Sequence, residues 1–269
     1  MGGGNLLPVN VWLGIDMGSS SIKGVLAAND ELIAGVILPV VGNYRKQAER
    51  VMEMVVEEGQ VSVEDVKGVG VTGVGSEGIE VKGPRFSEVA AHVRGVMAFY
   101  PHVRTVIDIG SQFTRAIVTD GGGKVRDFIV SEKCATGSGR FLQIMARILH
   151  IDVSEMGPLS LKALHPVEFS TGCAVFAESE AISRIAEGAK PEDIVAGVHR
   201  AMASKVEMLM RRVKWEPPVA LVGGGGEDTG LLRAIEEVLK INILVPLQPR
   251  LMGAFGAACL AANSHAPIS

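Results

Sequence analysis

This chain of 269 residues has few cysteines, few aromatic residues, no excess of positive charge and no long apolar run. A formal net charge of −4 offers no basic field for nucleic acid. Only 2 tryptophans, 2 tyrosines and 8 phenylalanines are present, so few side chains could stack on bases. Because no apolar run reaches about 18 residues, the sequence predicts no membrane span. Together these deficits argue against a nucleic-acid-binding protein and against a membrane protein.

The three cysteines are Cys134, Cys173 and Cys259. The N-terminal stretch MGGGNLLPVN lacks the cationic segment of a secretion signal, so we expect a cytoplasmic protein. In a reducing compartment, cysteines serve metal or redox chemistry more often than disulfides. The cysteine count therefore draws attention to metal binding or electron transfer.

Glycine, by contrast, is abundant: there are 33, well above the usual share of about 7%. One glycine-containing pattern occurs twice, as IDMGSSSIKGVL at 15–26 and IDIGSQFTRAIV at 107–118. Each copy predicts a strand, a turn and a second strand. Helical patterns at 44–59 and 85–100 separate the copies, so we predict an α/β protein built from two similar halves.

The second half contains further helix signals. Cys134 precedes an amphipathic pattern at about 138–149, and Cys173 starts a helix that Gly188 should end. A long helical pattern follows Pro191. The segment from about 217 to 240 predicts a strand, a glycine loop and a helix. A closing helix of small residues is expected to pack closely on a neighbour.

The two hairpin turns have the chemistry of phosphate sites. Gly18 and Gly110 allow a ligand to approach the backbone closely, and turns of this kind present N–H groups to phosphate oxygens. Asp16 and Asp108 precede the turns, where a carboxylate can reach phosphate-bound Mg²⁺ directly or through water. One hairpin alone is equally typical of ordinary structure, but two facing copies predict a clamp around a polyphosphate. No GxxxxGK[ST] phosphate loop occurs.

The two hairpins and the later segment ALVGGGGEDTGLL resemble the nucleotide-binding fold of actin, sugar kinases and heat-shock chaperones. Within that fold, EKCATGSGRFLQIMA, FSTGCAVFAESEAIS, IVAGVHRAMASKV and RLMGAFGAACLA resemble ATPases of the BadF/BadG/BcrA/BcrD type. These are activators of 2-hydroxyacyl-CoA dehydratases and ATPase subunits of benzoyl-CoA reductases. The resemblance implies a duplicated α/β fold with two subdomains and a cleft. We expect subdomains at 1–103, joined by the C-terminal helix of about 250–263, and at 104–249.

The resemblance assigns roles to residues of this chain. The first phosphate element matches Asp16, Gly18, Ser19, Ser20 and Lys23, and the second matches Asp108, Gly110, Ser111 and Gln112. The adenosine loop matches Gly223, Gly224, Gly225 and Gly226. Asp16 and Asp108 are candidate Mg²⁺ contacts, and Gln112 is a candidate to orient the attacking water. Lys23 and the equivalent Arg115 would approach phosphate or remain exposed.

The resemblance also implies one [4Fe–4S] cluster shared by two protomers, with Cys134 and Cys173 as the ligands from each. The residues agree with this, because a cubane cluster needs four thiolates and a helix N-terminus stabilises a thiolate. Buried free cysteines and a zinc site across a dimer are the alternatives. Cys259, in the small-residue helix, is interpreted as part of the core.

The function implied is ATP hydrolysis coupled to transfer of low-potential electrons. Ferredoxin or flavodoxin would be the donor, and an acyl-CoA-reducing or dehydratase component the acceptor. Phe113 stands where the family typically has Asp, and Arg115 replaces the usual Lys. This slightly favours a benzoyl-CoA reductase ATPase subunit over a homodimeric dehydratase activator, and Phe113 speaks against efficient hydrolysis. Homodimer and heterodimer both stay open, and a small-metabolite kinase or a nucleotide-responsive binding module are alternatives of another class.

Overall fold

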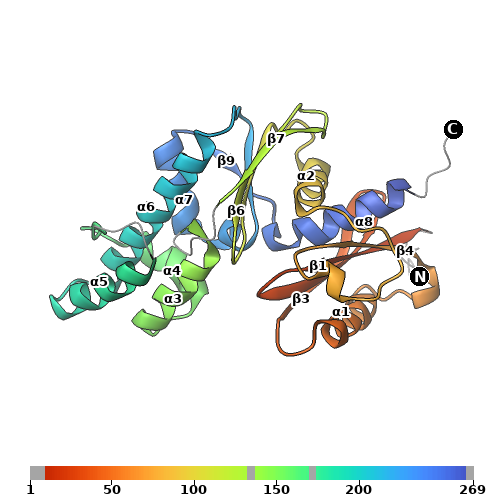
Figure 1. The fold of residues 1–269 in the computed structure, drawn as a ribbon, viewed down its shortest axis with the longest axis horizontal. Helices are drawn as coiled ribbons and strands as arrows, with labels where there is room; N and C mark the ends of the chain where they lie inside the picture. Colours follow the sequence, from red (N-terminus) through yellow and green to blue (C-terminus); the bar gives the residue numbers. More distant parts are fainter. Residues whose placement is uncertain (1–9, 132–136, 170–173, 265–269) are drawn as a thin grey trace, which may run out of the picture. The chain divides into compact units, whose positions relative to one another are not determined.

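The computed structural model describes residues 10–131, 137–169 and 174–264. The chain divides into two compact units. The first comprises Met1–Pro101 and Leu251–Ser269, and the second comprises His102–Arg250. Each unit is built from a mixed sheet and helices (Figure 1).

The first unit contains a four-stranded sheet in the order β3-β2-β1-β4. Its strands are β1 (Val11–Met17), β2 (Ser21–Ala28), β3 (Glu31–Pro39) and β4 (Val66–Thr72). β1 and β2 form the first predicted hairpin, and β4 runs parallel to β1. The central strands β1 and β2 are buried along nearly their whole length, which suits strands covered on both faces of the sheet.

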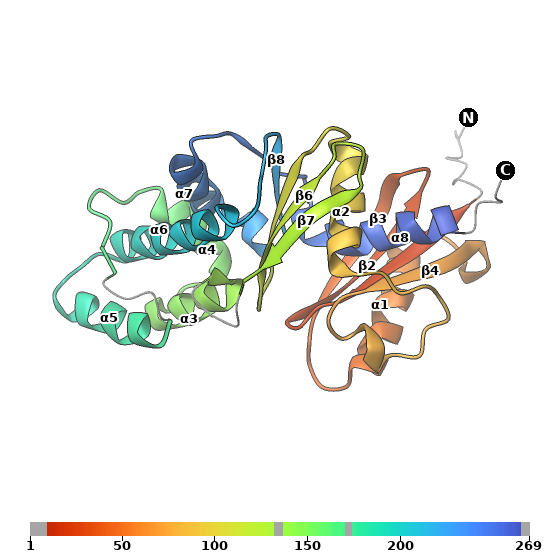
Figure 2. The same ribbon diagram turned by 45° about the horizontal axis from the view of Figure 1, so that its top comes forward.

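Helices cover both faces of this sheet (Figure 2). Helix α1 (Tyr44–Glu58) packs on β2 and β3, and α8 (Met252–Ser264) packs on β1 and β4 with α2 (Glu88–Phe99) beside it. A Cβ on Gly14 of β1 would collide with the backbone of Ala254, so only glycine permits this contact. The prediction that the small-residue helix packs closely on a neighbour is confirmed.

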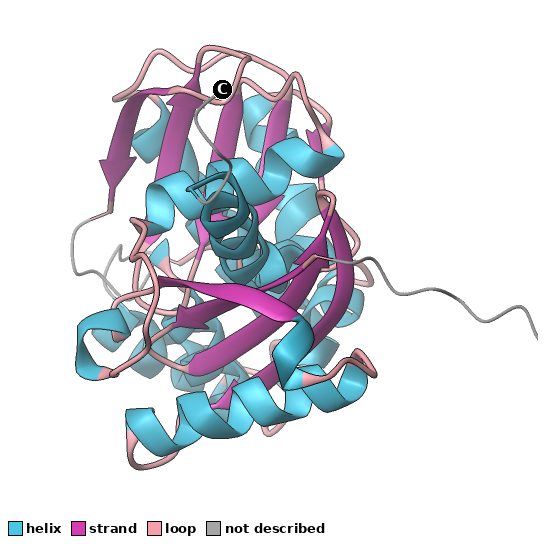
Figure 3. Cartoon of the chain, turned by 90° about the vertical axis from the view of Figure 1, so that its right-hand side faces the viewer, coloured by secondary structure: helices cyan, strands magenta, loops and turns pink. Residues whose placement is uncertain are grey.

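The second unit repeats the strand order of the first. Its sheet runs β7-β6-β5-β8-β9, with β5 and β6 forming the second predicted hairpin and β8 parallel to β5. Figure 3 shows the strands of the chain in magenta with the helices in cyan. The strands are β5 (Thr105–Ile109), β6 (Thr114–Thr119), β7 (Val125–Val130), β8 (Val219–Val222) and β9 (Ile243–Leu244). The order β7-β6-β5-β8 therefore corresponds to β3-β2-β1-β4.

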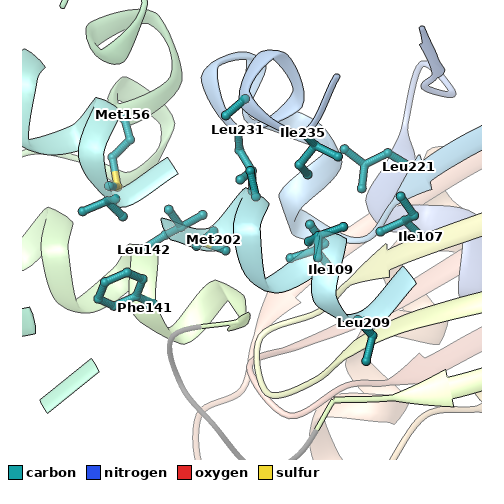
Figure 4. Packing of buried hydrophobic residues seen from close by; sticks show 14 of the residues in the cluster. Ile107, Ile109, Phe141, Leu142, Met156, Met202, Leu209, Leu221, Leu231 and Ile235 are labelled. Carbon is teal, nitrogen blue, oxygen red and sulfur yellow. The ribbon is translucent and has the colours of Figure 1, made fainter. Parts of the chain in front are cut away.

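Five helices belong to the described part of the second unit. They are α3 (Gly139–Leu149), α4 (Val153–Ser160), α5 (Ala174–Ala186), α6 (Pro191–Met210) and α7 (Thr229–Leu239). All five contribute to one core with the sheet, and α5 does so through Ala177 and Ala181. The largest side chains of this core include Phe141 of α3 and Met156 of α4, which are fully buried, as are Met202 of α6, Leu231 of α7 and Ile109 of β5 (Figure 4).

Two elements differ from the sequence-based expectations. Helix α4 was not predicted, because it contains Gly157 and Pro158, which normally break helices. The sequence feature that could have indicated this helix is the capping box that Asp152 and Glu155 form at its N-terminus. The two-residue strand β9 is too short to leave a pattern. None of the helices in the described segments is long and apolar enough to cross a membrane.

Candidate functional site

In the first unit, Asp16 is paired with Lys23. The two are Cα partners across the β1–β2 hairpin, and Lys23 Nζ donates a hydrogen bond to Asp16 Oδ2 at 3.0 Å. The exposed fractions of these side chains are only 7% and 14%. Burial strengthens the attraction because little water screens it. The expectation that Lys23 would approach phosphate or stay exposed therefore missed its contact with Asp16, although an ammonium group carries three donors and this contact uses one.

The first turn comprises Gly18, Ser19 and Ser20, between β1 and β2. A Cβ on Gly18 would lie 2.7 Å from Lys23 Nζ and 2.7 Å from the carbonyl oxygen of Ser21. Glycine is thus required for the lysine side chain to lie over the turn. Ser20, at the end of the turn, is exposed, and its carbonyl accepts a hydrogen bond from Val40.

Gly73 completes this arrangement and was not singled out from the sequence. It follows β4, whose last residue, Thr72, is the parallel partner of Asp16. Gly73 has φ of 93°, and a Cβ there would lie 2.5 Å from Asp16 Oδ1. One oxygen of Asp16 therefore contacts Lys23, while the other lies against a glycine that no other residue could replace without strain.

The second unit has the same three-part arrangement around Asp108. Arg115 is the Cα partner of Asp108 across the β5–β6 hairpin, and its guanidinium donates to Asp108 Oδ2 at 2.6 Å. The exposed fractions of the two side chains are 8% for Arg115 and 2% for Asp108. Gly223 follows β8 with φ of 77°, and a Cβ there would lie 2.6 Å from Asp108 Oδ1. Gly223 is thus the counterpart of Gly73.

The turn of the second hairpin comprises Gly110, Ser111 and Gln112. The Gly110 N–H donates to the carbonyl of Phe113 at 2.9 Å, which closes the turn. Gln112 is exposed, whereas Ser111 is half-buried. Exposure leaves the Gln112 side chain accessible to a ligand at this turn.

This second turn is joined to the first residues of α3. The backbone N–H of Gly139 donates to the Gly110 carbonyl at 2.9 Å, and that of Arg140 donates to the Ser111 carbonyl at 3.0 Å. The hydroxyl of buried Thr114 donates to the carbonyl of Gly137. These contacts tie the turn to the helix that follows Cys134 in the sequence.

The glycine loop continues from Gly223 as a short helical turn, Gly224–Glu227. A Cβ on Gly224 would have no neighbour within 4 Å among the described residues, whereas one on Gly225 would lie 2.6 Å from Ile109. The loop is therefore packed on one side and open beside Gly224. Asp228 ends the loop and caps α7 by accepting a hydrogen bond from Leu231 at 2.9 Å.

A buried histidine behind the glycine loop, His199, was not among the residues that the sequence singled out for the site. His199 lies with Nδ1 3.0 Å from Ser160 Oγ and Nε2 3.0 Å from Asp228 Oδ2. All three residues are buried, so His199 ties α4 and α6 to the start of α7. No pattern in the sequence indicated these neighbours.

Cys134 and Cys173 lie outside the described residues. Helix α5 begins at the residue that follows Cys173. Within the described segments, no three histidine, cysteine, aspartate or glutamate side chains gather as a metal site would require. Cys259 is buried in α8, and this burial raises the pKa of its thiol to about 12, as expected of a core residue.

Comparison with known proteins identifies relatives along nearly the whole chain. The model of the BadF/BadG/BcrA/BcrD ATPase family matches residues 13–261. A 2-hydroxyisocaproyl-CoA dehydratase activator from Clostridioides difficile is 40% identical over 93% of this chain and 94% of its own. A benzoyl-CoA reductase subunit from Thauera aromatica is 32% identical, over 97% of this chain and 96% of its own.

Solved structures agree with these relatives. An activator of the 2-hydroxyisocaproyl-CoA dehydratase from Clostridium difficile, with bound ADPNP, superposes with a TM-score of 0.90 at 38% identity, covering 94% of this chain and 95% of its own. A glucokinase from Streptomyces griseus superposes with a TM-score of 0.59, and the match covers 94% of this chain and 99% of the glucokinase. At 15% identity this likeness indicates a shared fold alone. The predicted fold class, α/β of the actin and sugar-kinase type, is confirmed.

Proposed function

Because this chain belongs to the BadF/BadG/BcrA/BcrD ATPase family, we propose that it hydrolyses ATP to activate a partner enzyme of the 2-hydroxyacyl-CoA dehydratase type. The sequence alone slightly favoured a benzoyl-CoA reductase subunit, on the grounds of Phe113 and Arg115. The relatives favour the alternative, since the dehydratase activator is 40% identical and the reductase subunit 32%. Two substitutions beside one turn carry less weight than identity along the whole chain.

The observation that carries the proposal is the duplicated arrangement of acid, cation and glycine. Both units place a buried, ion-paired aspartate beside a glycine-containing turn, at the same register of the same strand order. Asp16 and Asp108 each have one oxygen occupied by a cation. We therefore assign them to Mg²⁺ contacts through water rather than directly, with the turn N–H groups binding the phosphates.

The remaining proposed roles follow from exposure. Gln112 is exposed at the second turn, where its amide would orient the attacking water. The glycine loop is open beside Gly224, where the flat adenine base of ATP would lie against the backbone without a side chain in the way.

The turn's contacts with α3 supply a route from the nucleotide to the electron-transfer site. A turn that binds the γ-phosphate would relax when that phosphate is lost. Because Gly139 and Arg140 donate directly to the turn carbonyls, α3 would shift with it. The sequence immediately before α3 contains Cys134, the first proposed cluster ligand.

The cysteine content fits a shared [4Fe–4S] cluster. Each chain offers Cys134 and Cys173, while Cys259 is buried in α8, so four thiolates require two protomers. When bound, such a cluster supplies one-electron transfer at low potential. Ferredoxin or flavodoxin is the proposed electron donor, and the dehydratase component the proposed acceptor.

The test is an anaerobic reconstitution. Protein purified anaerobically is analysed for iron and sulfide, then assayed for ATP hydrolysis and for activation of a dehydratase component with dithionite as the reductant. We expect about four irons per pair of chains and activation only when ATP is supplied. A protein without iron after anaerobic reconstitution, or an activation indifferent to ATP, overturns the proposal. Activation of a benzoyl-CoA reductase component alone would instead support the second candidate.

A further inference from the structure

Arg115 is the central residue of a contact chain in the second hairpin. On one side its guanidinium donates to Asp108 Oδ2 at 2.6 Å. On the other side its guanidinium carbon lies 5.9 Å from the centre of the Phe113 ring. Phe113 immediately precedes β6, and Arg115 is the second residue of that strand, so the two side chains meet at the end of the hairpin next to the turn.

Each contact in this chain suits the residue types present. A guanidinium is planar, delocalised and weakly hydrated, so it can stack on an aromatic face while it donates hydrogen bonds at its edge. The backbone of Phe113 is itself fixed, because its carbonyl accepts the hydrogen bond from Gly110 that closes the turn. The guanidinium therefore has the Phe113 ring on one side and the Asp108 carboxylate on the other.

The first hairpin serves as an internal comparison. There the acid is Asp16, the cation is Lys23, and Ser21 occupies the position of Phe113. The compact ammonium of Lys23 reaches Asp16 at 3.0 Å without an aromatic neighbour at that position. The hairpin with arginine as its cation thus has the aromatic Phe113 two residues before it, whereas the hairpin with lysine has the small Ser21 there.

We propose that Phe113 and Arg115 form one positioning unit for Asp108, in which the ring fixes the guanidinium and the guanidinium fixes the carboxylate. This inference rests on the proposed function, since Asp108 is there assigned to the Mg²⁺-nucleotide. Arg115 binds the carboxylate at Oδ2, while Oδ1 lies 2.6 Å from where a Cβ on Gly223 would stand, so only glycine leaves room for it. Phe113 is then a supporting residue rather than a lost catalytic group.

A double-mutant cycle tests this coupling. The four proteins are the wild type, Phe113→Leu, Arg115→Lys and the double variant, assayed for kcat and KM of ATP hydrolysis. In the arginine background we expect Phe113→Leu to lower kcat about 3- to 10-fold, the range of a partly buried cation–π contact, with KM nearly unchanged. In the lysine background the same substitution should change kcat less than about 2-fold, because lysine pairs with the acid without a ring, as Lys23 does.

Controls separate positioning from folding. Phe128→Leu removes an exposed aromatic side chain from β7 of the same sheet and should leave kcat unchanged. Equal losses from Phe113→Leu in both backgrounds overturn the positioning unit, as does coupling that appears in the melting temperature but not in kcat. A wild type that hydrolyses no ATP would overturn the proposed function as well, whereas an active wild type with an uncoupled cycle would overturn this inference alone.

Discussion

The ammonium of Lys23 lies 3.0 Å from the carboxylate of Asp16, and the two residues face each other across the first hairpin. Asp108 and Arg115 repeat this relationship across the second hairpin, with the cation again seven positions after the acid. A glycine of positive φ, Gly73 or Gly223, lies against the other oxygen of each acid. The two halves therefore share a local charge arrangement as well as a strand order.

Substitution of Gly223 should disrupt this arrangement. In Gly223→Ala the new Cβ would lie 2.6 Å from Asp108 Oδ1 and 2.5 Å from the Ile109 carbonyl, at a φ of 77°. We expect the free energy of unfolding to fall by about 2–4 kcal/mol, from backbone strain and overpacking together. Urea denaturation measures this loss.

The neighbouring Gly224 is the matched control. A Cβ there has no neighbour within 4 Å among the described residues, so Gly224→Ala should retain the wild-type unfolding midpoint. If the nucleotide lies beside Gly224 as proposed, the same variant should bind ATP more weakly in calorimetry. Equal destabilisation by both alanine variants would contradict the packing described around Gly223.

The two hairpins could be predicted because apolar runs and turn residues mark each of them. The acid–cation pairs were also present as a signal, since each Asp precedes its cation by seven residues in a two-stranded hairpin. The sequence prediction for Lys23 and Arg115 was a phosphate contact or an exposed position. In the structure both cations are instead largely buried, and each is paired with the aspartate across its hairpin.

Other parts of the site depend on contacts between distant segments. Gly73 and Gly223 meet their aspartates only because β4 and β8 run parallel to β1 and β5, which no local pattern reveals. The neighbours of His199 come from two further elements, α4 and the start of α7. The proposed cluster cysteines lie outside the described residues, so their assignment stays a prediction.

The hydroxyl of Thr114 provides a test of the route from the turn to α3. Thr114→Val removes its hydrogen bond to the Gly137 carbonyl at nearly constant volume, which should destabilise the protein by about 1–2 kcal/mol. We expect ATP hydrolysis within about 2-fold of wild type but fewer electrons transferred per ATP. The ratio of dehydratase activation to ATP consumed measures this uncoupling.

Thr119→Val is the matched control, because Thr119 is buried at the other end of β6 and donates to the Val103 carbonyl at 2.7 Å. The Thr119 hydroxyl also accepts a hydrogen bond from the Gly121 N–H at 3.1 Å, so Thr119→Val should be destabilised at least as much as Thr114→Val. It should nevertheless keep the wild-type ratio. If Thr119→Val lowers the ratio as much as Thr114→Val does, loss of stability explains both and the route through α3 is wrong.

Burial of Cys259 predicts a specific pH dependence. Its thiol pKa is raised from 9.0 to about 12, chiefly by desolvation, so the folded state retains a proton that the unfolded state releases. The stability contribution of this thiol is therefore complete below pH 9 and decreases as the pH rises towards 12. In the Cys134→Ser/Cys173→Ser variant, iodoacetamide at pH 8 should alkylate the protein only after denaturation. Rapid alkylation of the folded variant would contradict the buried position.

Iron content provides the most direct test of the cysteine assignment. Cys134→Ser and Cys173→Ser should each abolish cluster assembly, because every pair of chains would then lack two of four thiolates. Cys259→Ser should keep the iron and sulfide content of wild type, since its side chain is buried within α8. The melting temperature and ATP binding of each variant are measured as well. A Cys134→Ser protein that is folded and binds ATP but contains no iron has lost a cluster ligand and has not misfolded. Retention of iron in both Cys134→Ser and Cys173→Ser, or its loss in Cys259→Ser alone, would show that the ligands are assigned to the wrong residues.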